Sequence, residues 1–182
     1  MLSQFTREHP SHTTLADLDF TFDKDIYPVG RLDRDSEGLL LLTNDKRLNA
    51  LILHPTNKKT KTYLVQVDGQ IDEEAIEKLK AGVPIKVNKK IYQTQPCEVK
   101  LLQMEPRIPE RNPPVRFRKH IPTSWIEVKL KEGKNRQVRK MTASVGFPTI
   151  RLVRSELGPL TIENMQSADI RQLHSKEIES LF

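Results

Sequence analysis

The densest group of reactive side chains lies at residues 30–38, in the run Gly-Arg-Leu-Asp-Arg-Asp-Ser-Glu-Gly. This run contains three carboxylates and two arginines within seven positions, directly before the apolar residues Leu39 to Leu42. A loop at the edge of a buried strand can hold a reacting side chain in a fixed position. The flanking Arg31 and Arg34 favour the ionised form of Asp33, and a carboxylate nucleophile must be ionised to attack. Asp33 is therefore the candidate catalytic group.

The same run admits two other interpretations. A salt-bridged surface turn is the more common fate of an arbitrary Arg-Leu-Asp-Arg sequence. A calcium loop would begin with Asp33, Asp35 and Glu37. Its twelfth position would fall on Asn44, which cannot bind the ion through two carboxylate oxygens. That loop would also have to pass through the apolar run at 39–42, so we discard it.

The charge of the chain suits a polyanionic partner. The 182 residues contain 30 Lys and Arg against 24 Asp and Glu, a formal net charge of +6. This excess is compatible with RNA, although many basic proteins bind none. With 36% hydrophobic residues, the chain is also able to bury a core of its own.

Composition also bears on location. Cys97 is the single cysteine, so no intramolecular disulfide can form and a reducing compartment is favoured. No apolar run approaches the roughly 20 residues that a membrane helix needs. Residues 1–10 lack the basic and then apolar layout of a signal peptide. We therefore expect a cytoplasmic protein that does not enter a membrane.

Hydrophobic periodicity predicts the elements that position residues 30–38. We expect strands at residues 39–42, 60–67, 83–87, 90–93, 98–104, 124–131 and 149–154. We expect helices at residues 14–18, from Asn44 or Asp45 to Pro55, and at 72–82, 135–145 and 175–181. Residues 104–122 hold five prolines among basic side chains, which predicts a long basic loop. Strands outnumber helices and short turns join many of them, which favours an α+β fold with a mixed, mainly antiparallel sheet.

Residues 30–43 resemble, without a gap, the catalytic signature of the RsuA-type pseudouridine synthases. The Lys-Thr-Tyr run at 61–63 is similar to the family's Lys-x-Tyr strand, and residues 132–141 are similar to its third motif. Leu-Val-Arg at 152–154, followed by Gly-Pro-Leu at 158–160, resembles the closing strand. The first motif is highly specific, whereas Lys-x-Tyr alone would carry no weight.

Within the family, the chain is most similar to the ribosomal large-subunit type called E. The resemblance rests on the Pro-rich basic run at 111–116 and on Ile-Pro-Thr-Ser-Trp at 121–125. It implies one catalytic domain over residues 1–182, without the separate S4-type RNA-binding domain of other members. The first N-terminal strand of the family, which contains a Lys-Pro motif, is not found before Leu2.

The resemblance also implies a fold, a reaction and catalytic roles. The fold would have two lobes around a central cleft, and the reaction would convert uridine to pseudouridine without a cofactor or metal. Asp33 would attack or deprotonate the ribose or the base, by a C1′ or a C6 route. Arg139 would form an ion pair with Asp33, and Tyr63 would stack on uracil or help to remove the C5 proton. Without the family motif, Arg139 would be a solvated helix residue and Tyr63 a core aromatic.

RNA contacts are expected from a wider set of residues. Arg31 matches the position that fills the gap left by an extruded base. Phosphate contacts or support of the site are expected from Arg34, Lys61, Arg136 and Gln137. The basic loop is expected to recognise the substrate or to be a merely soluble insertion, and its RNA-binding candidates are Arg111, Arg116, Arg118 and Lys119. The partner would be ribosomal RNA or the pre-ribosomal large subunit, the modified base would lie in 23S rRNA, and the enzyme would be a monomer.

Two other functions remain open at the level of sequence. A non-catalytic RNA-binding or ribosome-assembly factor would use the same charge and the same basic loop. A metal-dependent nuclease would use Asp33, Asp35 and Glu37 and would lose its activity in a chelator.

Overall fold

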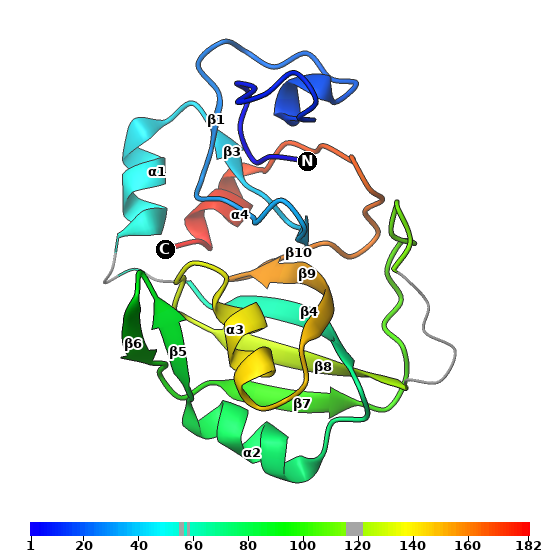
Figure 1. Cartoon of the computed structure of the whole chain (residues 1–182). Helices are drawn as coiled ribbons and strands as arrows, with labels where there is room; N and C mark the ends of the chain where they lie inside the picture. Colours follow the sequence, from blue (N-terminus) through cyan, green and yellow to red (C-terminus); the bar gives the residue numbers. More distant parts are fainter. Residues whose placement is uncertain (55–56, 58, 116–121) are drawn as a thin grey trace.

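The computed structural model of the chain describes residues 1–54, 57, 59–115 and 122–182. Over those residues, the lower lobe in Figure 1 contains a sheet of six strands. They are β2 (Glu37–Gly38), β4 (Lys61–Asp68), β7 (Glu98–Leu102), β8 (Thr123–Leu130), β9 (Thr149–Leu157) and β10 (Leu160–Thr161). Five follow the order β10-β9-β4-β8-β7 with antiparallel neighbours, and β2 joins β9 in parallel. The expected α+β fold with a mixed, mainly antiparallel sheet is confirmed.

The core of the lower lobe lies between this sheet and two helices, α2 (Glu73–Ala81) and α3 (Gln137–Ser144). Alternation along β4 buries Val65 completely, and Ile126 of β8 is equally buried beside it. The apolar stripe of α2 adds Leu79 to the same cluster. Each such side chain contributes roughly 1.5–3 kcal/mol to folding, so the core keeps the sheet rigid beneath the site.

Local signals in the sequence start the helices where they were expected. The Asp72 carboxylate accepts a hydrogen bond from the Ala75 amide at 2.8 Å, which caps α2. Asp45 caps α1 (Lys46–Leu53) in the same way and accepts from the Arg47 amide at 2.7 Å. The remaining elements are η1 (Leu15–Asp17), β1 (Tyr27–Pro28), β3 (Leu42–Thr43), the β5 (Pro84–Val87) and β6 (Lys90–Gln93) hairpin, and α4 (Ser175–Glu179).

The upper lobe in Figure 1 is built from the first 54 residues, apart from β2, and from the C-terminal segment. Strands β1 and β3 form a separate antiparallel pair there. Val29, Leu41, Ile52 and Leu181 form part of a second hydrophobic cluster, distinct from the core under the main sheet. The loop at residues 30–38 connects β1 of this lobe to β2 of the main sheet, so it lies where the two lobes meet.

The prediction of one buried strand at 39–42 is wrong. Gly38 has a φ of +103°, which turns the chain out of the main sheet directly after β2. The Leu39 amide still donates to the Arg154 carbonyl at 2.9 Å, but the Leu41 carbonyl accepts from the Val29 amide at 2.8 Å in the other lobe. The four leucines therefore cross from the main sheet to the other lobe, where Leu41 and Leu39 pack in the second hydrophobic cluster.

The described part of the Pro-rich loop, residues 103–115, contains neither helix nor strand, as its composition predicts. Three of the predicted RNA-binding residues, Arg116, Arg118 and Lys119, lie outside the described residues. Among the helices that the structure describes, none has the length and apolar character needed to cross a membrane.

Candidate active site

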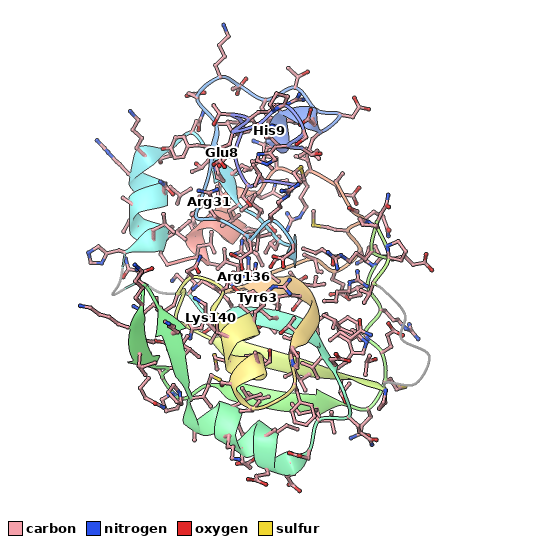
Figure 2. All side chains as sticks on the ribbon, in the orientation of Figure 1. Glu8, His9, Arg31, Tyr63, Arg136 and Lys140 are labelled. Carbon is pink, nitrogen blue, oxygen red and sulfur yellow. The ribbon has the colours of Figure 1, made fainter. Side chains whose placement is uncertain are left out.

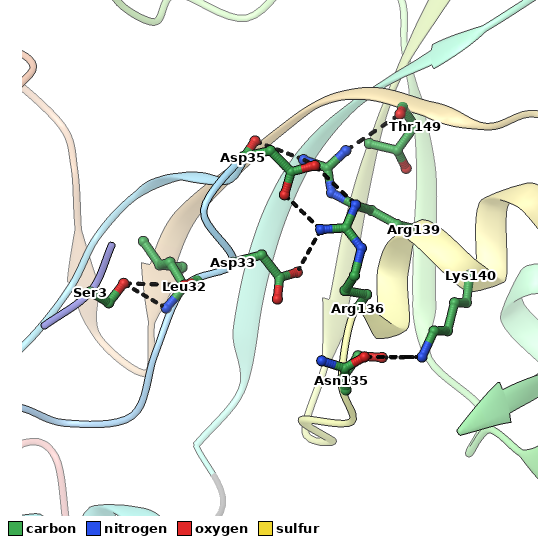
Figure 3. Close-up of polar contacts among 9 residues, drawn as sticks. All are labelled: Ser3, Leu32, Asp33, Asp35, Asn135, Arg136, Arg139, Lys140 and Thr149. Carbon is green, nitrogen blue, oxygen red and sulfur yellow. Dashed lines mark hydrogen bonds and ion pairs between the residues drawn. The ribbon is translucent and has the colours of Figure 1, made fainter. Parts of the chain in front are cut away.

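The loop that carries Asp33 is tied down on both sides. The Ser36 amide donates to the Asp33 carbonyl at 2.9 Å, which closes a tight turn. On the N-terminal side, the Ser3 hydroxyl accepts from the Leu32 amide at 3.0 Å (Figure 3). On the other side, Gly38 packs directly on the backbone of Arg154, where an added Cβ would lie 2.3 Å from the carbonyl oxygen. The Asp33 side chain is 29% exposed, so it is fixed in place and still reachable.

Two arginines from the start of α3 hold this loop from below. Arg136 binds Asp35 through both guanidinium Nη atoms, at 2.7 and 2.9 Å, and its Nη1 lies 3.9 Å from Asp33 Oδ2. Arg139 donates from Nη2 to the Asp35 carbonyl at 2.8 Å and lies 3.5 Å from Asp35 Oδ2 (Figure 3). Arg139 is only 10% exposed, so its charge acts in a partly dehydrated site.

The ion pair expected between Arg139 and Asp33 is replaced by one between Arg139 and Asp35. Arg136 is the N-cap residue of α3 and adopts the left-handed conformation, with φ 51°. With Arg136 in this conformation, its guanidinium approaches both carboxylates of the loop. Arg139, one turn later, reaches the Asp35 backbone from the buried side. A positive charge does lie near Asp33, but the guanidinium that comes closest to its carboxylate belongs to Arg136 and not to Arg139.

A buried carboxylate sets the position of α3. Glu132 is 3% exposed and accepts hydrogen bonds from the Tyr92 hydroxyl, the Gln95 amide at 2.9 Å and Gln137 Nε2 at 2.7 Å. The other end of the Gln137 amide accepts from the Lys134 amide at 3.0 Å. Both ends of Gln137 are thus used within the protein, which fits support of the site and argues against the expected phosphate contact.

Tyr63 comes from β4 and stands opposite Arg154 of β9 in the sheet register. Burial raises the pKa of the Tyr63 phenol, the positive charge of Arg154 opposes this, and the negative charge of Asp33 adds to it. The neutral phenol is therefore the form present at neutral pH. In the view of Figure 2, Tyr63 lies at the level where the two lobes meet. The charge of Asp33 acts on both Tyr63 and Arg139, so the three predicted catalytic residues lie in one region of the structure.

Arg154 is a member of the site to which the sequence assigned no role. It is 5% exposed, and its Nε donates to the Leu39 carbonyl at 2.8 Å. Its Nη2 is buried and has no hydrogen-bond partner among the described residues. Burial lowers the pKa of its guanidinium, and Tyr63 counteracts this. The signal that could have identified it is a charged residue directly after the apolar pair Leu152 and Val153 in a predicted strand.

The predicted RNA-binding residues differ in how free their side chains are. Arg31 and Arg34 are exposed, and Arg31 donates to Gln4 Oε1 at 2.9 Å. Lys61 Nζ donates to the Lys131 carbonyl at 3.1 Å, so it is tied to the protein. Arg111 lies 3.5 Å from Glu37 Oε1 and takes part in a separate cluster of charges.

The network at Asp35 predicts a dependence of stability on pH. The hydrogen bonds from Arg136 are the largest cause that lowers the pKa of Asp35, from 3.8 to about 2. A carboxylate with a lowered pKa stabilises the fold above its unfolded pKa, and this contribution is lost as pH falls through about 2. Since Asp35 is 42% exposed, we expect about 1 kcal/mol or less.

Urea unfolding of the wild type and Asp35→Asn at several pH values tests this expectation. The difference in the free energy of unfolding should be constant above pH about 5 and should shrink between about 4 and 2. In an Arg136→Gln background, the pH-dependent part should largely disappear. A difference that stays flat to the lowest pH would contradict the assigned ion pair.

With this geometry in place, the chain can be compared with known proteins. A family model described as RNA pseudouridylate synthase matches residues 1–144. The chain belongs to the RNA pseudouridylate synthase family. The resemblance inferred from residues 30–43 is therefore confirmed, and the motif lies inside the matched part.

Individual relatives place the chain within this family. It is 49% identical over 172 residues to ribosomal large subunit pseudouridine synthase E of Vibrio parahaemolyticus, covering 94% of this chain and 69% of that protein. The protein of that name in Xanthomonas campestris pv. campestris is 45% identical and is covered to 89%, again over 94% of this chain. Ribosomal large subunit pseudouridine synthase B of Bacillus subtilis is 36% identical over 86% of this chain and 57% of its own length.

A solved structure agrees with the family at the level of the fold. A crystal structure of a pseudouridylate synthase superposes with a TM-score of 0.71 at 26% identity. The match covers 88% of this chain and 63% of that chain. The fold of a pseudouridine synthase therefore accounts for most of this chain.

Proposed function

We propose that this protein isomerises a specific uridine of large-subunit (23S) ribosomal RNA to pseudouridine, with Asp33 as the reacting carboxylate. The reaction breaks the bond between uracil N1 and ribose C1′, joins C5 to C1′, and releases the C5 hydrogen as a proton, while N1 takes up a proton, so that the product is an isomer of uridine. It is redox-neutral and needs no cofactor. The observation that carries the proposal is the placement of Asp33, on a rigid loop between the arginines of α3 and Tyr63 of β4. The names of the relatives at 45–49% identity support the substrate class.

The site suits a carboxylate that must act in a fixed direction. Arg136 and Arg139 hold Asp35 and thereby the turn that carries Asp33, so the carboxylate is pre-positioned before the RNA arrives. The same two cations stabilise negative charge in the site while the base is detached. This geometry is compatible with attack at C1′ and at C6, because both routes need the Asp33 carboxylate to be held in a fixed position.

For Tyr63 the structure favours one of the two expected roles. Because burial raises the pKa of the phenol, a phenolate that removes the C5 proton would be scarce at neutral pH. A neutral ring can still stack on uracil, and base stacking on an aromatic ring contributes roughly 1–3 kcal/mol per base. We assign Tyr63 to holding the extruded base beside Asp33.

The RNA is proposed to approach from the side where cations of both lobes lie. Figure 2 labels Arg31 from the upper lobe, and Arg136 and Lys140 from α3 of the lower lobe, on either side of their junction. We propose that Arg31 enters the space left by the extruded base, because it lies two residues before Asp33 and is exposed. Arg34 and the basic loop with Arg111 would add phosphate contacts. We further propose that the protein acts as a cytoplasmic monomer with a single catalytic domain.

Arg139→Lys tests the positioning role of the buried arginine. A lysine ammonium cannot bridge the Asp35 and Thr149 carbonyls that Arg139 reaches at 2.8 and 3.4 Å. We expect the single-turnover rate to fall by roughly 100-fold while RNA affinity changes little. Arg136→Lys is the matched control. It removes the bidentate guanidinium pair of a more exposed arginine, so it should lower RNA affinity in addition to the rate. An Arg139→Lys rate close to that of the wild type would remove Arg139 from the machinery.

The nuclease alternative is disfavoured by how the three carboxylates are used. Asp35 is bound by two arginines, and Glu37 is bound by Arg151 at 2.9 Å, so neither turns toward Asp33 to share an ion. Within the described residues, no group of three acidic, His or Cys side chains could hold a metal.

Tritium release tests the proposed reaction directly. The wild type should release tritium from large-subunit rRNA that is labelled at uridine C5, and a chelator should leave the rate unchanged. RNA cleavage that stops in the chelator would favour the nuclease. Tight binding without release, on both naked rRNA and immature subunits, would favour an assembly factor.

A further inference from the structure

A second cluster of charges lies beside the catalytic loop and takes no part in the proposed reaction. Glu37 of β2 accepts from both sides of the Arg151 fork, with Nε to Oε1 at 3.1 Å and Nη2 to Oε2 at 2.9 Å. Arg151 of β9 is 7% exposed, so most of this pair is shielded from water. Bidentate charged pairs of this kind are strong and directional.

The same pair also holds the Pro-rich loop. Arg151 Nη2 donates to the Pro109 carbonyl at 2.6 Å, and Arg111 Nε lies 3.5 Å from Glu37 Oε1. One carboxylate and one guanidinium therefore join three segments: the end of the catalytic loop, the central strand β9 and the loop at 103–115. In Figure 1 this loop leaves the end of β7 and rises along the side of the molecule, toward the level of the upper lobe.

The loop has little structure of its own to hold it there. Within its described part, the backbone makes one hydrogen bond to itself, from the Ile108 amide to the Pro106 carbonyl at 3.0 Å. Prolines limit the conformations of such a segment, but they do not fix its direction relative to the rest of the protein. Contacts with Glu37 and Arg151 supply that direction.

We propose that Glu37 and Arg151 are positioning residues that dock the Pro-rich loop onto the catalytic loop, so that the loop is held ready to bind RNA beside Asp33. The inference rests on the proposed function and specifies how one of its RNA contacts is held. Glu37 lies four residues after Asp33, in the strand β2 that directly follows its turn, so the Pro-rich loop and Asp33 are held by adjoining parts of the chain. A preformed loop also reduces the entropy lost when RNA binds.

Limited trypsin digestion tests the docking without any need for activity. The substitutions Glu37→Gln and Arg151→Lys weaken the bidentate pair between these two side chains, but they leave every trypsin site in place. We expect cleavage after Arg107 and Arg111 to accelerate by about tenfold or more, because cleavage follows the population of the undocked loop. Arg171→Lys is the matched control, since Arg171 forms a similar fork with Glu177 on the exposed surface. Unchanged cleavage in both variants would overturn the docking.

RNA binding and turnover test what the docking does. In Glu37→Gln, the Kd for large-subunit rRNA should rise by about tenfold, while the single-turnover rate at saturating RNA stays within about threefold. A purely structural role in the catalytic loop would instead lower the saturating rate.

A variant with residues 106–114 replaced by a short Gly-Ser linker completes the test. If Glu37 acts through the loop, Glu37→Gln has no further effect on RNA affinity in this background. If the effect persists undiminished, the proposal is wrong. Should no RNA be isomerised at all, the digestion and affinity measurements still decide the docking, so the two failures can be told apart.

Discussion

Asp33→Asn should lower tritium release from C5-labelled rRNA by roughly 10³-fold or more, because an amide can neither attack nor accept a proton as a carboxylate does. The substitution preserves size, so the turn closed by the Ser36 amide should remain. Affinity for the RNA should therefore stay within about threefold of the wild type.

Asp35→Asn is the comparison that makes this result specific. It removes a neighbouring carboxylate that binds Arg136 and Arg139, and it should slow the reaction through misplacement of the turn by roughly 10- to 100-fold. If Asp33→Asn retained a tenth of the wild-type rate, the reacting group would have to be sought elsewhere.

Gly38→Ala should destabilise the protein by about 3 kcal/mol, which is a large effect for the addition of one methyl group. The φ of +103° is unfavourable for alanine, and the new Cβ would lie 2.3 Å from the Arg154 carbonyl oxygen. Relief of this collision would push β2 away from β9 and move Asp33 with it. We therefore also expect a loss of activity of roughly 100-fold.

Gly146→Ala separates the two causes of that instability. Gly146 has a φ of +93°, but no atom lies within 4 Å of where its Cβ would be. Gly146→Ala should lower the free energy of unfolding only by the cost of the unfavourable φ, about 1 kcal/mol, and should leave activity unchanged. Urea unfolding measures both values. Equal costs for the two variants would mean that the close approach at Gly38 does not matter.

The loop of Asp33 depends on contacts between residues that are far apart in the sequence. Arg136 and Asp35 are 101 positions apart, and Arg151 and Glu37 are 114 positions apart. Both arginines act on the loop from elements that follow the Pro-rich segment. The site is thus assembled only when the last third of the chain has folded against the first.

The sequence by itself was sufficient for features that depend on neighbouring residues. The starts of the helices near Asp45 and Asp72 and the alternation along β4 are local, so pattern and propensity predict them. The run at 30–43 also identified the family, since a long gapless motif is improbable by chance.

The tertiary structure decided how the charges are shared. Whether Arg139 pairs with Asp33 or Asp35 depends on the left-handed backbone of Arg136, which no local pattern predicts. The passage of residues 39–42 between lobes depends on the turn at Gly38 and on packing of Leu41 in the second hydrophobic cluster, both of which involve residues distant in the sequence. The docking of the Pro-rich loop and the buried place of Arg154 likewise arise only where separate strands meet, because ion pairs and burial are set by spatial neighbours.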